Sequence, residues 1–369
     1  MKHIGKLLGY ILLGSNIIFA VLFLVCAYSP YFNPVVHPVW SCFGLAFPAF
    51  LLINLCFLFF WLLFFWKYAF VSLLACLCCF SQIKTYFPVN YPVKEVPQNT
   101  FKLLSYNVMG FLGAKQHTKK NPNPIIEYLQ NCDADVICLQ EFIMGIDKYH
   151  LSKKDVDKAL KSYPYKVITE VGNTENALAC YSRYPILSSK HLEYESKYNG
   201  TAIYKLIIKG DTVTLINNHL ESNKLTYEDK ATYIDMIKDP KAEKVSSGMR
   251  LLISKLAEAS SIRAKQVQII ADVIKECGKS QVIVCGDFND TPISYAHRVL
   301  SQDLTDAFVQ SGTGLGISYN QNKFYFRIDN ILISKNLESF NCTVDNSIKD
   351  SDHYPIWCYI GKKDDSKNL

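Results

Sequence analysis

Charged side chains are absent from a long stretch near the start of this 369-residue sequence. None of its 39 Lys and Arg or 33 Asp and Glu residues lies between Leu7 and Trp66. Sixty uncharged, mostly apolar residues cannot form the water-exposed surface of a soluble domain, so a wholly soluble protein is excluded. The rest of the chain lacks a charge excess, because residues 98–369 hold 34 basic and 32 acidic residues. Such a near-neutral domain does not have the basic balance typical of nucleic-acid-binding proteins.

Matched pairs of cysteine motifs are also lacking. Six of the 13 cysteines precede residue 97 and seven follow it, and no CxxC pair is accompanied by a second Cys or His pair. Several of the later cysteines, such as Cys138 and Cys285, lie within apolar runs, where cysteine behaves as a small buried hydrophobic residue. The sequence therefore predicts neither a disulfide framework nor a structural zinc site.

Long apolar runs are present instead, and they predict a membrane anchor over residues 1–87 with two or three transmembrane helices. The runs cover residues 7–27, about 41–66, and a shorter stretch at 68–83. The first two are long enough to cross a hydrocarbon layer of ~30 Å. A cleavable signal peptide is a poor alternative, because further apolar runs follow the first.

The distribution of lysines predicts the orientation of these helices. Lys2 and Lys6 precede the first run, Lys67 separates the second from the third, and the first loop has no Lys or Arg. The positive-inside rule then places all three lysines in the cytoplasm. Three spans would put the following domain outside the cytoplasm. If the third run is only interfacial or re-entrant, the domain is cytoplasmic.

Beyond the anchor, residues 88–100 form a proline-containing linker, residues 101–361 form one domain, and residues 362–369 form a polar tail. In the domain, short apolar runs alternate with amphipathic ones, which predicts an α/β sandwich with a sizeable core. Gly210 and Asp211 are expected to form a hairpin turn. Strands are expected at 101–108, 135–140, 165–169, 177–182, 186–194, 201–209, 212–219, 281–286, 327–334 and 354–360, and helices at 123–131, 153–161, 225–238, 248–277 and 293–300.

Polar residues that can bind metal ions or phosphate lie at the ends of several apolar strands. Strands that are apolar throughout are buried on both faces, so we expect these terminal groups to gather at one rim of the sandwich. Carboxylate and amide oxygens without thiolates suit Mg²⁺ or Mn²⁺ better than zinc. The segments are SYN at 105–107, LQE at 139–141, NNH at 217–219, GDFN at 286–289, RID at 327–329 and SDH at 351–353.

The order of these segments resembles the endonuclease/exonuclease/phosphatase superfamily, which includes deoxyribonuclease I, sphingomyelinases and inositol-polyphosphate phosphatases. The resemblance covers about residues 100–360 and rests on SYNVMGF, LQE, NHLES, GDFND, RIDNI and SDHYPI. It implies a four-layered α/β sandwich and metal-dependent hydrolysis of phosphate esters. The segment NHLES looks most like the 5′-tyrosyl-DNA phosphodiesterase branch. The apolar N-terminus instead resembles bacterial members anchored in the inner membrane, which implies a multi-pass protein with a periplasmic, extracytoplasmic catalytic domain.

The resemblance also implies a metal site and a phosphate contact. Glu141, with Asn107 and Asp352, would hold Mg²⁺ or Mn²⁺, which acts as a Lewis acid on a phosphoryl oxygen. Arg183, in the segment YSRYPI, is a candidate for binding the substrate phosphate, although a plain surface role is the alternative.

Five further residues receive catalytic roles from the same resemblance. Asp287 would polarise the attacking water, and Asn289 would donate a hydrogen bond to a phosphate oxygen. His353, held and charged by Asp329, would stabilise the negative charge that develops on the phosphoryl group. His219, also as a cation, would contact the phosphate or assist the leaving oxygen.

One departure from a simple crossover lies between His219 and Asp287, which are 68 positions apart. This separation exceeds what a strand–helix–strand unit needs. The excess, roughly residues 223–250, carries basic and acidic residues in balance. A helical insertion of this kind could be a lid, a membrane-facing element or a spacer.

Three interpretations of the function follow. The first is a membrane-anchored, metal-dependent hydrolase of phosphate ester or pyrophosphate bonds, with lipid-linked phosphates as candidate substrates. The second is a nuclease or 5′-tyrosyl-DNA-type phosphodiesterase, which the neutral domain and the anchor disfavour. The third is a catalytically inactive, membrane-tethered binding module, which the complete polar set disfavours. The expected partners are therefore a phosphate-ester substrate and the membrane, with nucleic acid not favoured.

Overall fold

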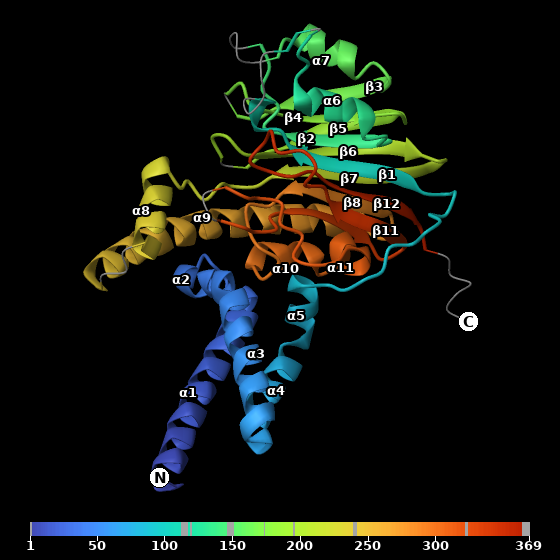
Figure 1. Cartoon of the computed structure of the whole chain (residues 1–369). Coiled ribbons are helices and arrows are strands. Elements are labelled where there is room, and N and C mark those ends of the chain that lie inside the picture. The colour runs from blue at the N-terminus through green and yellow to red at the C-terminus, as the bar shows by residue number, and fades with distance from the viewer. Residues whose placement is uncertain are drawn as a thin grey trace.

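The structure is a computed structural model that describes residues 2–111, 117–118, 120–145, 151–172, 174–194, 196–238, 242–321 and 324–363. It has two parts, a bundle of apolar helices at the N-terminus and an α/β domain (Figure 1). Of the predicted polar tail, residues 364–369 lie outside the described residues.

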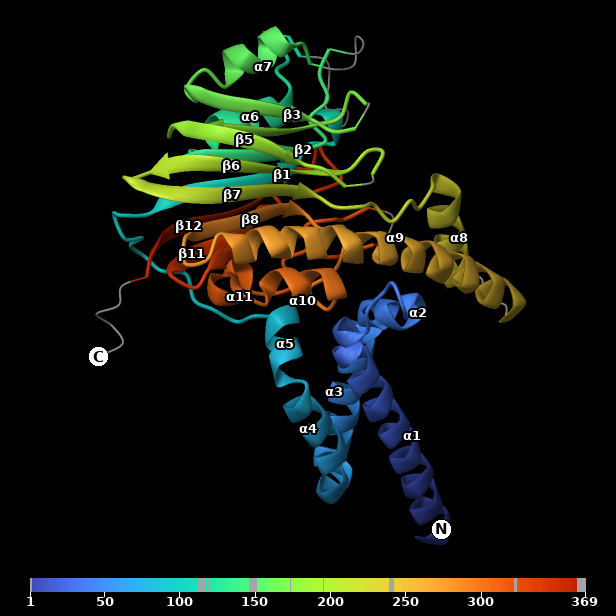
Figure 2. The same ribbon diagram turned by 180° about the vertical axis from the view of Figure 1, so that it is seen from behind.

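The α/β domain is built on two mixed six-stranded sheets, which pack face to face (Figures 1 and 2). The first sheet has the order β11 (Leu337–Val344), β12 (Ile356–Lys362), β1 (Phe101–Asn107), β2 (Val136–Gln140), β4 (Ala177–Ser182) and β3 (Tyr165–Glu170). The second sheet has the order β5 (Ile186–Leu192), β6 (Gly200–Ile208), β7 (Asp211–His219), β8 (Gln281–Asp287), β10 (Asp329–Ser334) and β9 (Leu304–Asp306). The expected hairpin turn joins β6 to β7.

Alternating side chains of these strands serve two different cores, as the period of a strand requires. Leu103, Leu215 and Ile283 lie between the sheets, whereas their neighbours Leu104 and Val284 face outward onto helices. The covering helices are α6 (Pro124–Asn131) and α7 (Lys153–Ala159) on the first sheet, and α9 (Ala242–Glu276) and α10 (Tyr295–Ser301) on the second. Helix–sheet–sheet–helix layering confirms the expected α/β sandwich.

Two strands and one helix escaped the sequence prediction. β9 has only three residues, too few to show a pattern, and α11 (Ala307–Ser311) has five. β11 alternates irregularly between buried and half-buried residues, and its pairing with β12 shifts register between Phe340 and Thr343. This bulge explains why no simple alternation was visible there.

The N-terminal bundle contains two helical segments, Lys6–Tyr31 and Pro38–Phe64, that are long and apolar enough to span a membrane. The third apolar run forms two helices that meet at an angle of 65°, so the number of candidate spans is three if this bent pair counts as one. The helices are α1 (Lys2–Tyr28), α2 (Pro38–Ser41), α3 (Phe47–Phe64), α4 (Ala69–Cys78) and α5 (Phe80–Tyr86).

Buried polar contacts join three helices of this bundle. Asn16 of α1 donates to the hydroxyl of Ser72 in α4 at 2.8 Å, and its side-chain oxygen accepts from Trp61 Nε1 of α3 at 2.9 Å. An unpaired polar group among apolar side chains is costly, so such groups bind one another. The contacts place α4 alongside α1 and α3, as Figure 1 shows.

The bundle docks on the helical layer of the domain formed by α9, α10 and α11 (Figure 2). Arg298 of α10 donates to the carbonyl oxygen of Pro30 at 2.8 Å, and Arg327 donates to that of Thr85 at 2.6 Å. Free carbonyls near helix ends attract cations in this way. The linker also adheres to the domain, since Asn90 Nδ2 donates to the carbonyl oxygens of Val309 and Gly312.

Candidate active site

Strand register brings chain-distant polar residues together at one edge of the second sheet. His219, the last residue of β7, lies beside Asp287, the last residue of β8, because these strands are parallel. Asp329, the first residue of the antiparallel β10, pairs with Asp287 from the other side. Each of the three lies an even number of positions from inner core residues of its own strand. Their side chains therefore face the space between the sheets.

Asn107 and Glu141 approach this edge from the first sheet. Asn107 Nδ2 donates to Glu141 Oε1 and to Asp287 Oδ2, both at 3.1 Å. His219 Nε2 lies 3.6 Å from Glu141 Oε1 and 3.7 Å from Asp287 Oδ2. An amide and an imidazole are thus held between two carboxyl groups.

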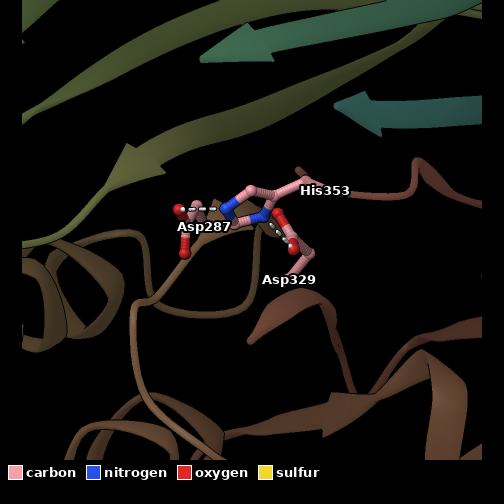
Figure 3. Close-up of side chains that lie close together, drawn as sticks. All are labelled: Asp287, Asp329 and His353. Atoms are coloured by element: carbon pink, nitrogen blue, oxygen red, sulfur yellow. Dashed lines mark hydrogen bonds and ion pairs between the residues drawn. The ribbon is translucent and has the colours of Figure 1, made fainter. Parts of the chain in front are cut away.

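His353 is the last member of the group, and Figure 3 shows its imidazole between the carboxyl groups of Asp287 and Asp329. Its Nδ1 lies 2.8 Å from Asp329 Oδ2, and its Nε2 lies 3.6 Å from Asp287 Oδ2. The imidazole and both carboxyl groups are buried. We refer to Asn107, Glu141, His219, Asp287, Asp329 and His353 together as the carboxylate–histidine cluster.

The two histidines of the cluster differ in charge. Burial lowers the pKa of His219, which keeps its imidazole neutral near pH 7. Burial also acts to lower the pKa of His353, but the carboxylates of Asp329 and Asp287 raise it well above the ordinary value. Burial thus favours a neutral His219, in contrast to the cation expected from the sequence, whereas the neighbouring carboxylates favour an imidazolium at His353.

Burial also sets the protonation of the acids. It raises the pKa of Asp287 to about 6, against the opposing influence of the His353 charge. It raises the pKa of Glu141 as well, although the hydrogen bond from Asn107 acts in the other direction. Asp287 is therefore poised to exchange a proton near neutral pH, which is the property required of a catalytic base.

The backbone at the site adopts uncommon conformations. Glu141 and Asn289 have φ values of +49° and +51°, a region that costs energy for residues with a Cβ and is often found at functional sites. Gly286 has φ +127°, and a Cβ there would lie 2.0 Å from the carbonyl oxygen of Asn218. Only glycine therefore allows β7 and β8 to approach each other beside the cluster.

Asn289 donates two hydrogen bonds to the carboxyl group of Asp287. Its backbone N–H donates to Asp287 Oδ1 at 2.8 Å, and its side-chain amide donates to Asp287 Oδ2 at 3.3 Å and to the carbonyl oxygen of Leu220 at 3.0 Å. These bonds orient the carboxyl group. The phosphate contact predicted for Asn289 would require its amide to exchange one of them.

Two sets of side chains could hold a divalent cation. Ligand atoms of Asp287, Asp329 and His353 all lie within 4.8 Å of one another, but here each imidazole nitrogen faces a carboxyl group. Glu141 is more open, with 32% of its side chain exposed, and it lies beside the amide of Asn107. This oxygen-rich set fits a hard cation such as Mg²⁺ or Mn²⁺.

The remaining two predicted site residues lie in different places. Asp352 directly precedes His353, and its negative charge contributes to the raised pKa of that histidine. Arg183 does not reach the cluster. It follows β4, whose last residue pairs with the first residue of β2, whereas Glu141 follows the last. Its guanidinium binds Asp133 at 2.8 Å and Asp135 at 3.4 Å, so the structure leaves it at the opposite edge of the sheet.

Arg263 is a structural residue of the site to which no sequence motif gave a role. Arg263 falls on the apolar face of the long helix α9 and is 3% exposed. It pairs with Asp290 at 3.2 Å and donates to the carbonyl oxygen of Glu221 and the side chain of Asn223. Arg263 thereby connects the segment that follows β7 with the segment that follows β8. These two strands end in His219 and Asp287.

A two-sheet α/β sandwich with carboxylates and histidines at one edge is the architecture of phosphoester hydrolases of the deoxyribonuclease I type. Residues 104–353 match the model of the Endonuclease/Exonuclease/phosphatase family, and the chain belongs to this family. Members of the family are phosphoester hydrolases, and they generally use divalent metals. Residues 9–86 match a second model, described as a domain of unknown function (DUF8431). A search of curated proteins found no match.

Solved structures share the fold at low sequence identity. TDP2 from D. rerio, complexed with single strand DNA product, is 19% identical with a TM-score of 0.51, over 72% of this chain and 100% of that chain. The endonuclease/exonuclease/phosphatase from Beutenbergia cavernae is 15% identical with a TM-score of 0.51, over 72% of each chain. That from Bacteroides vulgatus is 14% identical with a TM-score of 0.50, over 72% and 100%. At these identities the likeness shows the fold alone.

Proposed function

We propose that this protein is a membrane-anchored, metal-dependent hydrolase of phosphate ester or pyrophosphate bonds, and that its substrates are lipid-linked phosphates. The observation that carries the chemistry is the buried contact of His353 with Asp329 and Asp287, at 2.8 and 3.6 Å. It joins a cation that can stabilise phosphoryl charge to a carboxyl group that can take a proton from water. Family membership supports the reaction class.

The residues of the cluster have complementary roles in this proposal. Asp287, ionised above a pH of about 6, accepts the proton of the attacking water. His353, kept protonated by Asp329, donates to the phosphoryl oxygens as negative charge develops on them. His219, as a neutral imidazole, donates one N–H to the phosphate or the leaving oxygen. When bound by Glu141 with Asn107 and Asp352, a divalent cation supplies Lewis-acid polarisation of the phosphoryl group.

The position of the domain supports a substrate at the membrane. Arg298 and Arg327 fasten the domain directly to the ends of the apolar helices. A groove of about 830 Å³ also lies between α2, which connects α1 to α3, and the long helix α9. Val39, Met249 and Ile253 are among the residues that line it. An apolar groove at the end of the spans suits an acyl or prenyl chain. A membrane surface concentrates lipids in this way, but it does not concentrate duplex DNA.

The orientation proposed here has three spans and a domain outside the cytoplasm. It is supported by the packing of α4 against α1 through Asn16 and Ser72, because α4 then lies in the layer that α1 and α3 cross, and α5 continues from it to the domain. A reporter that is active only outside the cytoplasm should therefore work when fused after Leu369. The same reporter fused after Lys67 should be inactive. A reporter that is inactive at both sites would show that α4 and α5 do not cross and that the domain is cytoplasmic.

The substrate proposal predicts a preference that purified protein can show. The full-length protein in detergent should hydrolyse a polyprenyl pyrophosphate or a phospholipid at least about tenfold faster than single-stranded or tyrosyl-linked DNA. Equal substrate concentrations and physiological salt are required, because low salt favours DNA binding. Released phosphate and cleaved DNA are the two measurements.

The same assay tests the metal requirement. Exhaustive EDTA treatment should lower the rate at least about 100-fold, and added Mg²⁺ or Mn²⁺ should restore it. Glu141→Gln should need a higher cation concentration for half-maximal rate. Faster cleavage of DNA, with no lipid phosphate consumed, would support the nuclease interpretation instead, and full activity in EDTA would contradict the metal assignment.

A further inference from the structure

The insertion between His219 and Asp287 lies beside the carboxylate–histidine cluster. It contains α8 (Tyr227–Lys238) and the first half of α9. The 35 residues of α9 span about 52 Å, whereas the seven residues of β8 span only about 23 Å. Since α9 ends where β8 begins, its first half extends past the Asp287 end of β8, as Figures 1 and 2 show.

α8 is fixed at this position by its own capping contacts and by α9. The hydroxyl of Thr226 accepts from the backbone N–H of Asp229, and the carboxylate of Asp229 accepts from the backbone N–H of Thr226, which forms a capping box. The buried Asp229 also pairs with Lys255 of α9 at 2.5 Å. The insertion is therefore a built part of the domain and not a loose spacer.

The other side of α8 contacts the loop that carries Tyr319. The ring of Tyr233 stacks on Phe324 with 4.5 Å between ring centroids. Lys230 Nζ lies 2.9 Å from the hydroxyl of Tyr319 and 5.6 Å from the centre of its ring. Two hydrogen bonds join the backbones of Tyr319 and Phe326. α8 and this loop thus form one wall.

Tyr319 links this wall to the catalytic histidine. Its backbone pairs with that of His353, and the two rings meet edge to face with 5.2 Å between centroids. Lys230 and His353 are therefore neighbours of the same aromatic ring. Among the described residues, no carboxylate lies within ion-pair distance of Lys230, although α8 itself contains Asp and Glu residues. An ammonium group that has a hydroxyl partner but no carboxylate partner is suited to bind an anion.

We propose that α8 and Tyr319 form a second phosphate subsite, in which the Lys230 ammonium and the Tyr319 hydroxyl bind the phosphate group next to the scissile one. The substrate class is then a diphosphate and not a lone phosphate ester. This inference rests on the proposed function for the identity of the scissile site, next to His353.

The subsite has a defined part in the hydrolysis of a diphosphate. The water oxygen forms a bond to the scissile phosphorus, and the bond from that phosphorus to the bridging oxygen breaks. The electron pair stays on the bridging oxygen, which becomes part of the leaving phosphate. Asp287 receives one proton of the water, and the other remains on the product phosphate. Lys230 offsets the charge that the leaving phosphate gains.

Binding of small anions tests the subsite without catalysis. In calorimetric titrations of the full-length protein in EDTA, inorganic pyrophosphate should bind about tenfold more tightly than inorganic phosphate. Lys230→Met should abolish this preference, Lys230→Arg should keep it, and Tyr319→Phe should reduce it. Lys275→Met, which removes an exposed lysine of α9 paired with Asp272, should behave as the wild type. Thermal unfolding of each variant checks that it folds.

Hydrolysis provides the second measurement. With a polyprenyl pyrophosphate and the matching monophosphate, Lys230→Met should lower kcat/KM for the pyrophosphate about tenfold more than for the monophosphate. Equal losses on both substrates, or an unchanged anion preference in the folded Lys230→Met protein, would overturn the proposal. If the anion preference holds but no phosphate compound is hydrolysed, the proposed function fails and the subsite does not.

Discussion

Replacing Asp287 by Asn is expected to lower kcat by roughly 10³-fold, since the proton acceptor for water and its charge are both lost. The substitution keeps the shape of the side chain. Its amide oxygen, at the position of Oδ1, still accepts from the backbone N–H of Asn289, whereas its amide nitrogen replaces the oxygen that accepts from Asn107. Steady-state rates at pH 8, where the wild-type carboxyl group is ionised, measure the effect.

The same variant should not lose stability. The pKa of Asp287 is about 6 in the folded protein, above the ~3.9 of an unfolded chain, so the ionised carboxylate costs folding free energy at pH above 6. A neutral amide removes this cost, and the Tm at pH 8 should stay equal or rise. Asp272→Asn, on the exposed face of α9, should leave both rate and Tm unchanged. A folded Asp287→Asn enzyme with near-wild-type turnover would show that the base lies elsewhere.

The edge of the second sheet could be predicted because strand periodicity continues into the site. In β8 the apolar side chains of Ile283 and Cys285 face the inner core, and the next residue of the same parity is Asp287. The same count leads from Leu215 to His219. Once a strand is recognised as buried on both faces, a polar residue at its end has no apolar role, and this is why these residues were noticeable.

Features that depend on strand pairing were not visible in the sequence. Arg183 lies at the end of an apolar strand, as Asp287 does, and therefore looked equivalent to it. Its place was decided by the antiparallel pairing of β4 with β2, which sets Ser182 opposite Val136 and far from Glu141. No local pattern distinguishes the two directions of a strand.

The protonation states of the two site histidines could not be predicted from the sequence either. His219 and His353 both end polar segments, yet only His353 has a carboxyl group within hydrogen-bond distance of its ring. Tyr319 and Lys230 had no motif at all, because a loop and a helix separated by 89 residues meet only through the packing of the insertion. The sequence indicated that the insertion existed but left its role open.

Replacing Asp329 by Asn is expected to lower kcat by roughly 10²–10³-fold at pH 8 and to move the pH optimum to lower pH. Activity requires ionised Asp287 and protonated His353, so the pH profile of the wild type should be bell-shaped. Asp329 is the largest of the influences that raise the pKa of His353, so its removal lowers this pKa and moves the alkaline limb down. The acid limb moves the same way, because the Asp329 charge also raises the pKa of Asp287.

This double shift separates an electrostatic role of Asp329 from a structural one. The pair of His297 and Asp306, with 2.9 Å between nitrogen and oxygen, offers a matched control because it is equally buried and contains the same groups. Asp306→Asn should lower the Tm and leave the pH optimum in place, whereas Asp329→Asn should move the optimum. Profiles of kcat/KM against pH for the three proteins decide the matter. An Asp329→Asn profile of reduced height but unchanged limbs would mean that Asp329 only holds the ring in position, and that the charge of His353 has another source.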